Sequence, residues 1–205
     1  SKYEMTQGQW KALTGENPAR HKMTDGAGEL HPVESITWFQ SKGTLENAGL
    51  SLSTEAQWEY SARGGAEGPW WACTTLEEFQ ELKLGNIGDR AAFRSGYRWG
   101  GIMELPTYDD GWVLHAPIGT YPPNQFGLYD SIGNLYEMCE DSVDWKFYSK
   151  SPELDPVNRV GITRISRGAS YVHSATMGRS AKRRGDQPND RDDFIGIRPA
   201  RTLDR

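Results

Sequence analysis

Three segments near the start of the chain show the pattern of short amphipathic helices that begin after a threonine. In each, a Thr is followed three residues later by a Gln: Thr6 with Gln9, Thr37 with Gln40, and Thr54 with Gln57. The hydroxyl can cap the first turn while the Gln side chain reaches back to the backbone. The pattern predicts one helix with Trp10 and Leu13 on a single face that stops at Gly15. It predicts two more, from Trp38 to Ala48 and from Glu55 to Arg63.

The pattern changes after a fourth, shorter helix, which we expect over Leu76 to Leu82 behind Thr75 and Glu78. From Lys83 to Pro117 no period is sustained, which indicates long loops. These loops are expected to be ordered, because a flexible linker would not carry this many aromatic residues: Phe93, Tyr97, Trp99, Tyr108 and Trp112. From Arg164 to Arg201 the chain is typical of a strand, a polar loop and a second strand, ISRGASYV and then FIGIRPAR.

The stretch from Pro117 to Asp141, PIGTYPPNQFGLYDSIGNLYEMCED, fits neither helix nor sheet periodicity. Turn formers crowd its first half, and acidic and amide side chains then surround Gly133, where the backbone can bend sharply. Oxygen-bearing side chains around such a turn suit a hard cation. We therefore expect a rigid loop here, able to close around a metal ion.

Length and composition narrow the classes of protein. With 205 residues the chain fits one domain, and eight Trp with a mean hydropathy of -0.72 indicate an aromatic-rich core under polar loops. The net charge of -5 and the pI near 5.4 give no attraction to nucleic acid, so we expect no nucleic-acid partner. No stretch approaches the ~18 apolar residues of a membrane span.

The two cysteines, Cys73 and Cys139, are too few for a disulfide-rich scaffold or a zinc site built on cysteines. One disulfide between them is possible in principle. Two free, mostly buried thiols are the favoured expectation.

The Pro117 to Asp141 stretch closely resembles the signature of the formylglycine-generating enzyme family, the sulfatase-modifying-factor group. Four further blocks resemble the same family in the same order: KYEMTQGQWKAL, HPVESITW, LSTEAQWEYSARGG and RISRGASY…RSAKRRGDQPNDRDDFIGIRPAR. The resemblance implies a single α+β domain over residues 1–205, with little regular secondary structure and a core like that of C-type lectins. That fold hosts oxidases, accessory domains and binding proteins alike.

The beginning of the chain, SKYEMTQGQW, matches a point partway through the family's first strand. We therefore expect the N-terminal strand to be truncated, and the lack of a signal sequence then says nothing about the compartment. An extracytoplasmic or cell-surface location is slightly favoured.

The resemblance also implies two structural calcium sites, each built from side-chain oxygens and backbone carbonyls. The first would use Asn86, the carbonyl of Ile87, Asp110 and the carbonyl of Trp112. The second would use Asp130, the carbonyls of Gly133 and Leu135, and Glu137. Hard oxygen donors around flexible turns suit Ca²⁺. The alternative is that the two aspartates only cap turns; calcium is favoured at the second site, and the two interpretations are equal at the first.

In the family, copper held by two thiolates oxidises a substrate cysteine, because soft sulfur ligands select Cu(I). The corresponding segment here, RGASYVHSATMGRS, contains no cysteine, and His173 takes the first thiolate position. The other histidines, His21, His31 and His115, show no metal-ligand spacing with it. We expect no copper. A divergent metal-dependent oxidoreductase stays open as an alternative, because a cysteine-poor relative acts in pyoverdine maturation.

The favoured function is binding of a protein or small-molecule ligand through the C-terminal loops. There, the candidate binding residues alternate with scaffold positions that match the family, an arrangement that resembles the variable proteins of diversity-generating retroelements; ordinary accessory members with the same scaffold are an equal alternative. The predicted ligand-binding residues are Tyr136, Ser170, Tyr171, His173, Arg179, Arg184, Asp186, Asp192 and Phe194.

We expect Tyr171, His173, Arg184 and Phe194 to converge with Tyr136 on one exposed patch, since aromatic and Arg side chains anchor recognition surfaces. The alternative is that the two C-terminal aromatics fill the core, because strand residues alternate between faces. The basic run from Arg179 to Arg184 suggests an anion-binding patch. With the nearby acids Asp186, Asp190, Asp192 and Asp193, a mixed ion-pair surface is favoured instead.

Overall fold

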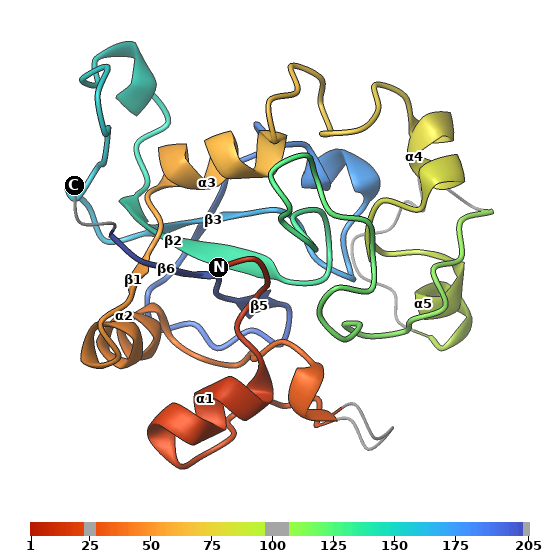
Figure 1. Ribbon diagram of the computed structural model, residues 1–205, viewed down its shortest axis with the longest axis horizontal. Helices are drawn as coiled ribbons and strands as arrows, with labels where there is room; N and C mark the ends of the chain where they lie inside the picture. Colours follow the sequence, from red (N-terminus) through yellow and green to blue (C-terminus); the bar gives the residue numbers. More distant parts are fainter. Residues whose placement is uncertain (23–27, 97–106, 203–205) are drawn as a thin grey trace.

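The computed structural model describes residues 1–22, 28–96 and 107–202, with short helices arranged around a small mixed sheet (Figure 1). The α-helices are α1 (Gln7–Thr14), α2 (Trp38–Asn47), α3 (Glu55–Arg63), α4 (Leu76–Leu82) and α5 (Arg90–Arg94). Single 3-10 turns are η1 (Gly28–Leu30), η2 (Phe147–Ser149) and η3 (Ala175–Gly178). Among the described residues, no helix is long and apolar enough to cross a bilayer.

The four predicted helices are confirmed, together with their caps. Each of α1, α2, α3 and α4 begins with a complete capping box, in which the Thr hydroxyl accepts from the N3 amide and the N3 side chain accepts from the cap amide. Such a cap stabilises a helix by about 1 kcal/mol, because it satisfies amides that have no partner within the helix. Gly15 and Gly64 end α1 and α3 in the left-handed conformation.

The main sheet has the strand order β4-β3-β2-β5. Its strands are β2 (Tyr136–Ser142), β3 (Arg164–Arg167), β4 (Arg184–Asp186) and β5 (Ile195–Gly196), and only the β2–β5 pair is parallel. A second, two-stranded sheet pairs β1 (Ser51–Leu52) with β6 (Pro199–Ala200). In Figure 1, α3 lies above β2 and β3, whereas α1 and α2 lie below the sheet.

The central strand β2 was not expected, since the sequence around it shows no alternation of polar and apolar residues. The structure gives the reason: both faces of β2 are covered, and six of its seven residues are buried. Tyr136 and Met138 pack into the core cluster that includes Trp10 and Trp38. Cys139 belongs instead to a cluster with Trp58 of α3. A strand buried on both faces has no polar side to give it a period of two.

The C-terminal region also differs from the predicted strand, loop and strand. β3 ends at Arg167, because Gly168 and Ala169 adopt positive φ angles of 98° and 67° and turn the chain. The polar stretch that follows contains η3 and β4, and the predicted last strand is divided between β5 and β6, which belong to different sheets.

In the described part of the segment from Lys83 to Pro117, the helix α5 is an element that the sequence pattern did not predict. The Asp89 side chain accepts from the Ala92 amide at 3.0 Å and caps α5. Tyr108 is buried, as ordered loops require, whereas Tyr97 and Trp99 lie outside the described residues. The predicted free and buried thiols are confirmed for Cys73 and Cys139.

A buried ion pair crosses the centre of the molecule. Glu137 of β2 is 1% exposed and accepts from Arg198, whose Nη2 and Nε lie 2.6 Å and 2.9 Å from its carboxylate oxygens. The indole Nε1 of Trp58 donates to the same carboxylate at 2.7 Å. Both carboxylate oxygens are therefore satisfied without water.

Replacing Glu137 by Ala should lower the free energy of unfolding by about 3–5 kcal/mol, because it leaves the Arg198 charge buried without a partner. Chemical denaturation of the two proteins measures this difference. The matched control is Glu46→Ala, which removes an exposed carboxylate paired with Lys42 one helical turn away. That change should alter stability by no more than about 0.5 kcal/mol. Equal losses in the two variants would contradict the central role of the buried pair.

Candidate functional site

Two aromatic residues of the predicted binding set meet where β2 and β5 pair. The parallel register places Tyr136 opposite Ile195, and the Tyr136 amide donates to the carbonyl of Phe194 at 2.9 Å. His173, from the loop after β3, packs edge-on against both rings, with ring centroids 4.9 Å from Tyr136 and 5.4 Å from Phe194. Three predicted residues from three segments therefore form one aromatic cluster.

The Arg184 side chain completes this cluster. Its guanidinium carbon lies 4.9 Å from the ring centroids of both Tyr136 and Phe194, within the range of cation–π contact. Its Nε donates to Asp186 at 2.7 Å, and its Nη2 lies 3.9 Å from an oxygen of Asp192. Arg184 thus sits as a cation between two aromatic rings and two carboxylates. We call these residues, with Ser170 and His173, the Arg184 cluster.

His173 is fixed on both sides of its ring. Its Nδ1 lies 2.7 Å from the hydroxyl of the buried Ser170, and its Nε2 lies 3.4 Å from the Arg184 guanidinium. Burial, with a further contribution from the Arg184 charge, lowers the pKa of His173 to about 4. The imidazole is therefore neutral at physiological pH, where it can accept or donate one hydrogen bond but carries no charge.

Two polar atoms of the Arg184 cluster lack hydrogen-bond partners among the described residues. They are the buried Oδ2 of Asp186 and the buried Tyr136 hydroxyl, which lies near the Arg184 guanidinium without a hydrogen bond of normal geometry. Burial raises the pKa of Tyr136 to about 12, with the nearby Arg184 charge acting in the opposite direction, so the phenol keeps its proton. Buried polar groups are rarely left unsatisfied in native proteins. This phenol and this carboxylate oxygen are where a polar ligand group would find partners.

The prediction of one exposed patch is wrong in two respects. Tyr136 and Phe194 are almost fully buried, and only His173, Arg184 and Asp192 of the cluster are partly exposed. Tyr171 lies elsewhere: it is 1% exposed, its ring is edge-on to His115, and its hydroxyl donates to the carbonyl of Asp193 at 3.3 Å. Tyr171 belongs to the core because the turn after β3 directs it inward.

Arg179 also lies apart from the Arg184 cluster. It is exposed, and its Nε donates to the carbonyl of Thr176 at 2.9 Å, within the turn formed by η3. Of the nine predicted ligand-binding residues, the structure therefore brings together seven and separates Tyr171 and Arg179.

The first predicted calcium set contains an unsatisfied oxygen and one carboxylate, with a second carboxylate beside it. The buried Oδ1 of Asn86 has no hydrogen-bond partner among the described residues. Asp110 accepts from the amides of Trp112 at 2.8 Å and Ile87 at 3.1 Å. Asp89, which the prediction did not include, accepts from the Asp110 amide at 2.7 Å. Burial and then the Asp89 charge raise the pKa of Asp110 to about 8. These residues fit a hard cation.

The second predicted set differs, because its glutamate already has a cationic partner. Glu137 is bound by Arg198 and Trp58, contacts between distant segments that sequence reasoning missed and that no local signal encodes. Asp130 accepts from the Gly119 amide at 2.6 Å, and its Oδ1 is buried without a partner among the described residues. Burial raises the pKa of Asp130 to about 6.

The backbone of the second set, at Gly133 and Leu135, runs beside the first set. The Asn134 amide donates to the carbonyl of Asn86 at 2.8 Å, and a Cβ on Gly133 would lie 1.9 Å from that same oxygen. Only glycine permits this approach. The Leu135 amide donates to the buried Glu4 at 3.0 Å. Among the described residues, these two sets included, no three His, Cys, Asp or Glu side chains converge as metal ligands.

Comparison with known proteins assigns the family. The model of the sulfatase-modifying factor enzyme 1-like domain matches residues 1–203, and the chain belongs to this family. The formylglycine-generating enzyme of Streptomyces coelicolor is 33% identical over 178 residues, which cover 85% of this chain and 54% of that protein. The serine/threonine-protein kinase pkn1 of Chlamydia pneumoniae is 31% identical over 176 residues, which cover 84% and 24% respectively. The chain thus spans about half or less of the length of these relatives.

Solved structures confirm the expected α+β fold of the formylglycine-generating-enzyme type. PvdO from Pseudomonas aeruginosa superposes with a TM-score of 0.77 at 25% identity, covering 99% of this chain and 79% of that one. Treponema denticola variable protein 1 superposes with a TM-score of 0.76 at 22% identity, covering 96% and 83%. The second likeness establishes the fold alone.

The lowered pKa of His173 has a consequence for stability. Below about pH 6.5 the unfolded chain binds a proton at this residue, whereas the folded protein does not until about pH 4. The free energy of unfolding therefore falls as the pH drops from 6.5 to 4. Between pH 8 and pH 5, His173→Gln should lose about 2 kcal/mol less than the unaltered protein. Urea denaturation at the two pH values measures this; identical losses would show that His173 titrates normally.

Proposed function

We propose that this chain is a binding domain that recognises a protein or small-molecule ligand at the Arg184 cluster. The observation that carries the proposal is the buried Oδ2 of Asp186, which has no hydrogen-bond partner among the described residues. This oxygen belongs to a cluster that also contains two aromatic rings. His173 occupies the position at which the family resemblance places the first copper thiolate, so the cluster lies where relatives perform their chemistry. Recognition sites typically combine such aromatic surfaces with a few polar groups.

The charges of the cluster favour a ligand that donates hydrogen bonds or carries a positive charge. Arg184 supplies one cation, whereas Asp186 and Asp192 supply two carboxylates, one of them 3.9 Å away. Because His173 is uncharged at physiological pH, it does not offset this excess of negative charge. A cationic or N–H-bearing group can bind the unsatisfied carboxylate oxygen and stack on the rings.

Removing Arg184 should make this preference measurable, because Arg184→Ala vacates the space between Tyr136 and Phe194. Methylguanidinium should then raise the melting temperature of the variant by about 2–4 °C, the shift expected for about 1 kcal/mol of binding in a domain of this size. The unaltered protein, whose own guanidinium fills the site, should respond much less. Thermal denaturation at matched ionic strength measures both.

The controls use two acids that differ only in their position. Asp186→Asn in the Arg184→Ala background should abolish the response to methylguanidinium, because it removes the carboxylate that the cation needs. Asp190→Asn should preserve the response, because that exposed side chain accepts from the Gln187 amide instead. A response that survives Asp186→Asn, or none above sodium chloride, would refute the proposal.

Diversification of the C-terminal segment is a further part of this proposal, supported by the fold shared with a variable protein. Neighbouring genes decide it: an adjacent reverse transcriptase gene and a near-copy of this segment would be its signature. The alternative function is a divergent metal-dependent oxidoreductase. The observation in its support is the 33% identity to a formylglycine-generating enzyme. One stoichiometric copper or iron ion per chain would support that alternative over the binding domain.

We further propose that calcium stabilises the domain at the Asn86–Asp110 set, supported by the unsatisfied Asn86 oxygen. Calcium should raise the melting temperature of the unaltered protein, and Asp110→Asn should abolish most of that rise, because it removes a charged ligand. The matched control is Asp109→Asn, one residue earlier, a half-exposed side chain whose carboxylate lies 3.6 Å from Arg94. Calorimetry with calcium or a chelator measures the effect, and equal rises in both variants would contradict this site.

A further inference from the structure

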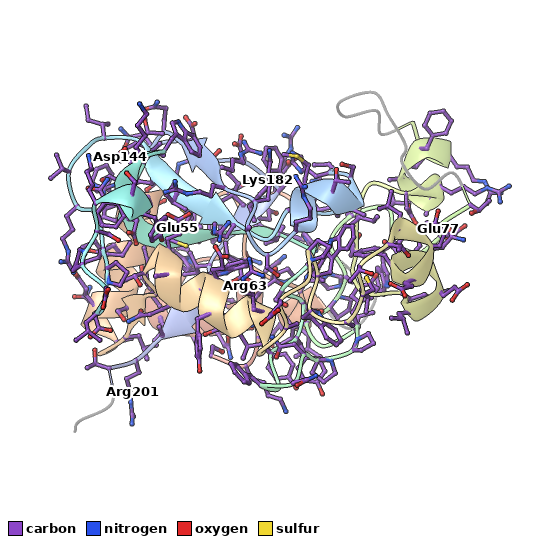
Figure 2. The ribbon with its side chains drawn as sticks, turned by 90° about the horizontal axis from the view of Figure 1, so that it is seen from above. Glu55, Arg63, Glu77, Asp144, Lys182 and Arg201 are labelled. Carbon is purple, nitrogen blue, oxygen red and sulfur yellow. The ribbon has the colours of Figure 1, made fainter. Side chains whose placement is uncertain are left out.

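A groove lies between the end of α3 and the turn that follows η3. Its walls include Arg63, Glu67 and Pro69 on one side and Arg179 and Lys182 on the other. A hydrogen bond of 2.8 Å from the Ser180 amide to the carbonyl of Pro69 joins the two walls. The groove is open to solvent and has a volume of about 360 Å³, room for many water molecules and for a small anion. Figure 2 looks down on this side of the molecule and labels Arg63 and Lys182.

The three cations of the groove differ in how far they are neutralised. Arg63 forms a salt bridge with Glu59 at 2.7 Å and donates to the carbonyl of Gly68 at 3.2 Å. Among the described residues, no carboxylate lies within ion-pair distance of Arg179 or Lys182. The Arg63 side chain is therefore held in place and partly neutralised. Arg179 and Lys182 instead contribute positive charge that no described carboxylate neutralises.

This arrangement revises the expectation of a mixed ion-pair surface for the basic run. The expected pairing is found at Arg184, which binds Asp186 and lies 3.9 Å from Asp192, whereas Asp193 binds Arg20 outside the run. Arg183 is taken by the buried Glu55 of α3 at 2.7 Å. The run thus divides into arginines that are paired and two cations that are not.

We propose that this groove binds a tetrahedral oxyanion group, a phosphate or a sulfate, between Arg179 and Lys182. Arg179 uses Nε in its bond to Thr176, and its remaining guanidinium donors have no acceptor among the described residues. A guanidinium fork matches two oxygens of an oxyanion, and a lysine adds a mobile point charge. A phosphate monoester carries about -1.5 to -2 charges at neutral pH, which suits two unpaired cations.

Glu67 is the acid among the described residues that line the groove, and it opposes such a ligand. Its side chain is exposed, and its carbonyl accepts from Arg63 at 3.5 Å. Removing its charge should therefore strengthen anion binding without disturbing the wall. A change at Glu67 should therefore raise the affinity for an anion, whereas changes at the two cations should lower it.

The oxyanion groove shares no residue with the Arg184 cluster, so the two proposals stand or fall separately. Lys182 precedes β4, whereas Arg184 is its first residue. The Lys182 carbonyl accepts from the buried Arg167, so the backbone of the groove is held by a contact that side-chain changes at residue 182 leave intact.

The test is a calorimetric titration of the whole chain with sodium sulfate and with inorganic phosphate, at an ionic strength held constant with sodium chloride. Saturable binding is expected, with an apparent Kd that rises about tenfold in Lys182→Gln and in Arg179→Gln, the loss expected for one charge-assisted bond. Glu67→Gln should lower the Kd several-fold. Lys11→Gln, an equal change of charge on the exposed side of α1, should leave it unchanged.

Phosphoserine distinguishes the source of the oxyanion. Binding as tight as that of the free ions, or tighter, assigns the groove to an esterified group on a partner, and weaker binding assigns it to free inorganic anions. The proposal is overturned if sulfate and phosphate bind no better than chloride. It is equally overturned if Lys182→Gln and Arg179→Gln bind them as the unaltered chain does.

Discussion

The buried carboxylate of Glu137 is the constraint on which the rest of the structure depends. It lies on the central strand and is bound by Arg198, which also donates to the carbonyls of Lys2 at 2.9 Å and Tyr129 at 2.8 Å. Through Trp58 the same carboxylate holds α3 against the sheet. A buried charge without its partner is destabilising by several kcal/mol, so the beginning, middle and end of the chain must assemble together. In a fold with so little regular secondary structure, such contacts between distant segments hold the chain in one arrangement.

A second group of buried charges holds the C-terminal strands under α3. Arg167, at the end of β3, is fully buried and contacts Glu55 and Glu59 of α3. Arg183, just before β4, binds Glu55 and covers the rings of Trp145 and Tyr148. These pairs hold the backbone at Lys182, because Arg183 follows it directly and Arg167 also donates to its carbonyl. Both proposed binding regions therefore extend from a rigid scaffold, which lowers the entropic cost of ordering a site when a ligand binds.

What the sequence predicted was local, and what it missed depended on contacts across the chain. The helices could be predicted because a Thr and a Gln three residues apart encode their own cap. β2 could not, because a strand covered on both faces loses its alternation. For the candidate site, the family pattern brought Tyr136, His173 and Arg184 together correctly. It could not place Tyr171, since a positive φ at Ala169 turns the chain and decides which aromatic points inward.

The basic run of the C-terminal segment shows why charge cannot be interpreted from neighbours in sequence. Arg183 and Arg184 are adjacent in sequence. Arg183 is neutralised by a carboxylate of α3, whereas Arg184 is neutralised by Asp186, two residues away. Arg183 lies just before β4 and Arg184 begins it, so the two neighbouring cations meet unrelated partners. Carboxylates reach only some of these cations, and Arg179 and Lys182, which precede the strand, are left without one among the described residues. Uncompensated charge is thus located by topology, and an anion would be drawn to the turn before β4 and not to the strand itself.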